Sequence, residues 1–162
     1  MKISSRVLTG IVFLAFIVGI GGTMVLNLWY TESRKVPAVY TEGELAGTAD
    51  PGDIRGSYSF KDIEAAFRVP VKDLAAAFGV EDDPDTFLCK ELETIYAGLE
   101  YGEIGTDAVR LFVARYLKLP YEPHADTLLP ETAFSVLGDR IDQETIERME
   151  AIRTGSITVE QE

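Results

Sequence analysis

The side chains best suited to metal chemistry lie in a loop bounded by prolines. His124 is the only histidine of the chain, and Glu122 and Asp126 stand two residues away on either side. An imidazole with two carboxylates provides metal ligands, but a single histidine in a polar loop is more often simply solvated. We therefore predict no metal or other cofactor here.

The second reactive side chain is Cys89, the only cysteine. A single cysteine excludes an intramolecular disulfide and a cysteine-ligated cluster within the chain. Its neighbours Phe87, Leu88 and Leu92 are apolar, which predicts a buried, unreactive thiol. No local signature relates Cys89 to His124, and no other nucleophile and base form a recognisable pair, so we expect no catalytic activity.

Residues 81–85 form an acidic turn, Glu-Asp-Asp-Pro-Asp, that invites comparison with a calcium loop. The EF-hand loop requires alternating oxygen ligands, a central glycine and a distant bidentate glutamate. The glycine is missing. The turn is better explained as a solvated stretch whose last residues cap the following helix.

Five residues are candidates for contact with a partner protein. Tyrosine is enriched at protein interfaces, which singles out Tyr96, Tyr101, Tyr116 and Tyr121. Arg55 is a rare cation in an acidic region. It either pins its own segment to the domain through a carboxylate or contacts a partner.

The longest feature of the sequence is an uncharged run from Val7 to Tyr30, which follows a basic flank at residues 1–6. About 20 apolar residues cross a bilayer, so the run predicts one transmembrane helix. A cleaved signal peptide is the alternative, although the run exceeds the usual apolar length. Lys2 and Arg6 favour a cytoplasmic N-terminus and an extracytoplasmic C-terminal domain.

One face of this predicted membrane helix carries small residues: Ala15, Gly19, Gly22 and Thr23. Small side chains allow a second transmembrane helix to approach closely. We therefore expect packing against another integral membrane protein within the lipid bilayer. Glycine is also simply common in membrane helices, which is the alternative explanation.

The remainder of the chain is strongly acidic. The net charge is −12, and it becomes −14 for the residues after Tyr30 because Lys2 and Arg6 are the only charged side chains before that point. Such a surface repels nucleic acid and anionic lipid. It suits a soluble acidic domain or a basic partner.

Apolar periodicity predicts a linker at 31–57, rich in proline and glycine, an all-α acidic domain at 58–155 and a flexible tail at 156–162. Six helices are expected, at 59–69, 70–79, 87–97, 106–119, 130–138 and 142–155. In the third, Leu88, Leu92, Ile95 and Tyr96 should face inward, and Thr106 with Asp107 should cap the fourth. The first two form a helix-turn-helix-like corner without a basic recognition helix, so DNA binding is not expected.

The stretch DIRGSYSFKDIEAAFRVPVKDLAAAFGV, followed by DTFLCKEL, resembles small helical modules associated with membrane redox proteins, including ferredoxin-type membrane proteins. The resemblance covers residues 53–92 and implies no active-site residue. It implies an accessory subunit beside redox machinery. We thus predict a non-catalytic, membrane-anchored accessory or interaction subunit of a membrane protein complex. The alternative is a membrane-tethered domain that binds or senses a small ligand.

Overall fold

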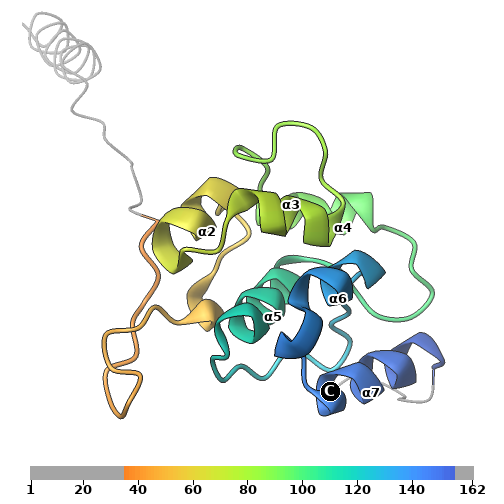
Figure 1. Cartoon of the computed structure of the whole chain (residues 1–162). Coiled ribbons are helices and arrows are strands. Elements are labelled where there is room, and N and C mark those ends of the chain that lie inside the picture. Colours follow the sequence, from red (N-terminus) through yellow and green to blue (C-terminus); the bar gives the residue numbers. More distant parts are fainter. Residues whose placement is uncertain (1–34, 156–162) are drawn as a thin grey trace, which may run out of the picture. The chain divides into compact units, whose positions relative to one another are not determined.

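The computed structural model describes residues 35–155 (Figure 1). The predicted transmembrane segment 7–30, its small-residue face at Ala15, Gly19, Gly22 and Thr23, and the tail 156–162 lie outside these residues. Within 35–155, no helix combines the length and the apolar character that a bilayer crossing requires.

The described residues form six α-helices and no β-strand, which confirms the all-α prediction. The helices are α2 (Phe60–Phe67), α3 (Val71–Phe78), α4 (Leu92–Ile95), α5 (Thr106–Leu117), α6 (Glu131–Leu137) and α7 (Gln143–Arg153). Short 3-10 turns precede or extend them: η1 (Pro51–Asp53), η2 (Cys89–Glu91) and η3 (Gly138–Arg140).

The predicted corner between α2 and α3 is present and is defined by its caps. Ser59 Oγ accepts a hydrogen bond from the Asp62 N–H at 3.2 Å, and Asp62 Oδ2 accepts one from the Ser59 N–H at 2.7 Å. This reciprocal capping box satisfies donors that the first helical turn leaves free. Pro70 caps the start of α3, and Gly79 ends it at a φ of 64°.

The core is centred on α5 and three aromatic rings. Phe60, Phe78 and Phe112 are fully buried, with ring centroids 6.1 Å apart for the first two and 5.5 Å for Phe78 and Phe112. α5 buries more than the single apolar stripe of an amphipathic surface helix, because Leu111 and Ala114 are fully buried in addition to Val109, Phe112 and Val113. Such a helix is a central packing element and leaves little of its surface for binding.

The helix predicted at 87–97 is wrong in its extent. The Phe60 N–H donates to the Phe87 carbonyl at 3.0 Å, and the Cys89 N–H donates to the Tyr58 carbonyl at 2.9 Å. Because these bonds hold the chain extended at Leu88, helical structure begins only at Cys89, and α4 itself is four residues long. Ile95, expected inside, is 52% exposed.

Residues 35–57, predicted as part of a linker, pack against the helices. Ile54 is fully buried, and its carbonyl accepts a hydrogen bond from Arg110 Nε on α5 at 2.8 Å. The Tyr40 hydroxyl donates to the Pro120 carbonyl at 3.2 Å, across 80 positions of sequence. This segment is therefore part of the domain and does not act as a spacer.

Candidate functional site

Arg55 does not pin the N-terminal segment to the domain. Its side chain is 67% exposed and pairs with Asp53, only two residues away, at 3.3 Å. The segment is attached to α5 by Arg110, which donates to the Ile54 carbonyl and to Asp107. Arg55 stays available as a surface contact.

Two of the candidate tyrosines have their hydroxyls engaged inside the domain. The Tyr96 hydroxyl donates to the Phe78 carbonyl at 3.0 Å. The Tyr116 hydroxyl donates to Asp73 Oδ2 at 2.7 Å, and the Arg140 guanidinium lies 4.1 Å from the centre of its ring. These contacts join helices, so both side chains have structural partners already.

Tyr121 belongs to a cluster around Asp107, whose side chain is 14% exposed. Asp107 does not cap α5, where Gly105 occupies the cap position. Its carboxylate accepts hydrogen bonds from the Tyr121 hydroxyl, the Thr127 hydroxyl at 2.6 Å and the His124 N–H at 2.9 Å. Asp107 therefore fastens the loop 121–127 to α5.

The electrostatics of this cluster follow from the same contacts. Partial burial acts to raise the pKa of Asp107, but the bonds from Thr127, Tyr121 and His124 outweigh it and hold the pKa below its usual value. Burial and the neighbouring carboxylate both raise the pKa of Tyr121. At neutral pH the pair is thus an ionised acceptor and a neutral donor.

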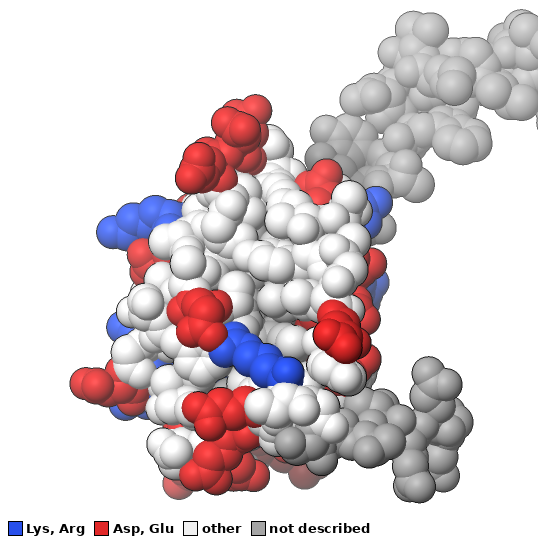
Figure 2. Space-filling model, turned by 90° about the vertical axis from the view of Figure 1, so that its right-hand side faces the viewer, with Lys and Arg blue, Asp and Glu red and all other residues white. Residues whose placement is uncertain are grey.

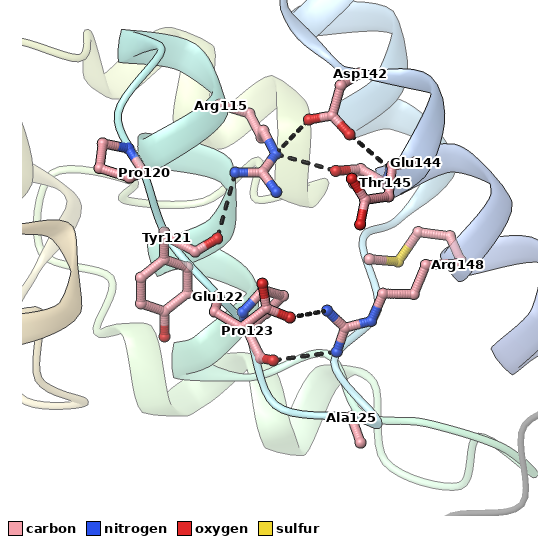
Figure 3. A pocket seen from close by; sticks show the side chains of 11 residues that line it. Arg115, Pro120, Tyr121, Glu122, Pro123, Ala125, Asp142, Glu144, Thr145 and Arg148 are labelled. Atoms are coloured by element: carbon pink, nitrogen blue, oxygen red, sulfur yellow. Dashed lines mark hydrogen bonds and ion pairs between the residues drawn. The ribbon is translucent and has the colours of Figure 1, made fainter.

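A polar cleft of about 530 Å³ lies between the loop after α5 and α7 (Figure 3). It is lined by Arg115, Pro120, Tyr121, Glu122, Pro123, Ala125, Asp142, Glu144, Thr145, Arg148 and Met149. We call it the arginine cleft, because Arg115 and Arg148 extend across it (Figure 3).

Both guanidinium groups of the arginine cleft have protein acceptors. Arg115 Nε lies 2.8 Å from Asp142 Oδ2 and donates to Thr145 Oγ1 at 3.0 Å. Arg148 pairs with Glu122 at 3.3 Å and donates to the Pro123 carbonyl at 3.1 Å. These bonds join the loop to α7, so the arginines stabilise the fold and present no uncompensated positive charge to a ligand.

The surface with the character of an interface is an open groove of about 430 Å³, which we call the apolar groove. It is lined by Tyr96, Leu99, Glu100, Tyr101, Ile104, Leu128, Leu129, Pro130, Glu131 and Arg153. Leu99 is 43% and Tyr101 48% exposed. Of the predicted interaction tyrosines, Tyr101 is the one whose ring lies open on the surface.

Figure 2 shows the side of the domain on which α4, the loop after it and the end of α7 lie. On this face side chains without charge cover a broad area, with acidic side chains around it and one basic side chain lying across its lower part (Figure 2). A surface with few charges at its centre and more at its edge resembles the anatomy of a protein interface.

Close backbone approaches shape the apolar groove. At Gly102, with φ at 75°, an added Cβ would lie 2.6 Å from Leu128 Cδ1, so only glycine allows these two segments to meet. The Glu103 N–H then donates to the Asp126 carbonyl at 2.8 Å. From α7, Arg153 donates to the Leu129 carbonyl at 2.9 Å and pairs with Glu131.

The residues considered for chemistry are not assembled into a reactive site. Cys89 is fully buried, as expected, and burial raises the pKa of its thiol to about 12. His124 is exposed and contributes its backbone N–H to Asp107. Within residues 35–155, no group of three or more histidine, cysteine or acidic side chains is placed to hold a metal ion.

Polar groups inside the described part of the chain are internally satisfied. No buried side-chain nitrogen or oxygen there is without a hydrogen-bond partner. The chain matches no protein-family model, and no curated protein or solved structure shows significant similarity to it.

Proposed function

We propose that this chain is a non-catalytic, membrane-anchored interaction subunit of a membrane protein complex. The apolar groove is the observation that carries the proposal. An exposed apolar surface with a polar border is typical of a protein interaction site. The uncharged run from Val7 to Tyr30 supports the anchor, and its small-residue face supports a second contact within the bilayer.

The charge around the apolar groove defines the chemistry of its partner. Glu100 and Glu131 line it, with Glu131 paired to Arg153, and the sequence after Tyr30 has a net charge of −14. A partner segment with an apolar centre and basic flanks complements such a surface. The partner we propose is therefore an integral membrane protein that presents a basic, amphipathic segment next to the bilayer.

A small apolar ligand, such as a quinone or a lipid, is the second candidate occupant. The volume of the apolar groove lies in the range of ligand pockets, about 300–1,000 Å³. Such pockets bury most of their ligand, roughly 70–90% of its surface. Leu99 and Tyr101 are nearly half exposed, which favours the broad contact of a protein segment.

The test compares two variants of the full chain, each purified in mild detergent with its native partners. Leu99→Asp places a carboxylate in the apolar groove, whereas Ile95→Asp makes the same change at a 52%-exposed residue that does not line it. We expect Leu99→Asp to reduce the co-purified partner about tenfold, since losing about 1.4 kcal/mol suffices for that. The Ile95 variant should retain it. Equal recovery with both variants would contradict the groove as the contact surface.

The resemblance of residues 53–92 to modules of membrane redox proteins makes a redox complex the first class to examine. The same purification can be followed by visible absorption. Haem or cluster absorbance that belongs to the co-purified protein, and is lost with it in Leu99→Asp, supports this class. A colourless partner argues against it and leaves the interaction itself standing.

A further inference from the structure

A second apolar surface lies at the beginning of the described domain. A groove of about 390 Å³ is lined by Lys35, Val36, Pro37, Val39, Gly47, Ala49, Ala65 and Ala66. Val36 is 68% and Val39 50% exposed. We call this surface the valine patch.

The valine patch is unusual for so acidic a chain, because none of its lining residues is acidic. Its one charged member, Lys35, pairs with Asp62 at 2.6 Å. The patch thus combines exposed aliphatic side chains with a compensated charge. It is suited to a neutral, partly apolar surface and not to a charged one.

The covalent structure limits how far the valine patch can lie from a membrane. Five peptide units separate Tyr30, the end of the predicted span, from Lys35. Fully extended, they reach at most about 17 Å. The headgroup zone on each side of a bilayer is itself about 6 Å deep, so if residues 7–30 span the bilayer, Lys35 at the edge of the patch lies at most about 11 Å beyond the lipid surface.

We propose that the valine patch is seated in the headgroup region of the bilayer, with Val36 and Val39 in contact with neutral lipids. The inference rests on the proposed anchoring by residues 7–30. The length of chain between span and domain and the absence of acidic residues from the patch favour lipid as the occupant. Zwitterionic headgroups suit it, since the overall negative charge of the chain repels anionic ones.

The test uses the full chain reconstituted into phosphatidylcholine nanodiscs. An environment-sensitive fluorophore is attached through Val39→Cys, with Ile95→Cys as the control, because the two side chains are 50% and 52% exposed. The native Cys89 is fully buried, so we expect it to remain unlabelled. The wild-type chain, taken through the same labelling reaction, checks this. Lipids that carry a nitroxide near the headgroup quench a probe that touches them.

We expect the probe at position 39 to be quenched about threefold and to emit at shorter wavelength, while the probe at position 95 changes little. Equal quenching at both positions would overturn the proposal. A blue shift at position 39 without quenching would mean that protein, such as a second copy, covers the patch, and would overturn it too. Failure to enter nanodiscs would refute the anchor itself, which separates that outcome from the other two.

Discussion

Replacing Asp107 by asparagine tests whether one carboxylate holds the loop 121–127 on the domain. The two Asp107 oxygens accept hydrogen bonds from Arg110, Tyr121, His124 and Thr127. Asparagine keeps one acceptor oxygen, but its NH₂ then faces either the His124 N–H or the Arg110 guanidinium, and neither group can accept a hydrogen bond.

The expected cost of Asp107→Asn follows from these bonds. A hydrogen bond to a charged group contributes about 1.5–3 kcal/mol, and at least one is lost outright. We therefore expect a decrease of about 2–3 kcal/mol in the free energy of unfolding. For a domain of this size that lowers the midpoint temperature by roughly 10 °C.

The assay is urea and thermal unfolding of the full chain in nonionic detergent, followed by far-UV circular dichroism. Asp126→Asn is the matched control, since Asp126 lies in the same loop but its side chain has no such set of donors. A decrease in Asp107→Asn no larger than in the control, or below about 0.5 kcal/mol, would refute the reasoning.

The pH dependence of stability gives a second test of the Asp107→Asn variant. The pKa of Asp107 is lower in the folded state than in the unfolded state. The carboxylate therefore contributes its full stabilisation of the fold above the ordinary carboxyl pKa, about 4, and this stabilisation is lost as the pH falls through the lower pKa of the folded state. Asparagine does not titrate. The stability gap between wild type and Asp107→Asn should therefore close below about pH 4.

Two further variants test the core and the corner. Phe112→Ala should destabilise the domain by about 3–5 kcal/mol, since Phe112 is fully buried against Phe78. Urea unfolding measures the loss, and a value below about 1 kcal/mol would contradict the position of Phe112 at the centre of the core. Ser59→Ala removes one half of the capping box and should cost about 1 kcal/mol, with faster amide exchange in the first turn of α2; unchanged exchange there would show that the cap is not needed.

Local signals in the sequence predict much of the helical structure. The box between Ser59 and Asp62, the Asp142 cap that accepts from the Thr145 N–H at 2.7 Å, and Gly79 at the end of α3 all act within four residues. A short-range pattern of this kind is visible in the chain itself. At these places the predicted helix boundaries at residues 59, 79 and 142 agree with the structure.

The errors come from contacts that join distant positions. The extended backbone at Leu88 depends on pairing with Ser59, and no pattern within residues 87–97 announces that partner. The proline- and glycine-rich segment 35–57 has the composition of a linker, yet Arg110 on α5 binds its Ile54 carbonyl. Composition describes how a segment can turn but not what it packs against.

The candidate site shows the same difference between local signals in the sequence and contacts from distant positions. Residue type alone identifies Tyr101, which lies in the apolar groove with Leu99 of the same loop, but Leu128 and Arg153 join it from two other segments. Asp107 was expected to cap a helix, and its role as a loop anchor depends on donors contributed by a loop further along the chain. Residue type alone identifies a candidate, whereas the fold decides its role.

The packing of the N-terminal segment has a consequence for biosynthesis. The Tyr40 hydroxyl and the Pro120 carbonyl that it contacts are 80 residues apart. At 5–20 residues per second, a ribosome needs roughly 4–16 s to make the stretch between them. Tyr40 is therefore synthesised several seconds before the residue that its hydroxyl contacts, and this contact can form only after most of the domain has been made.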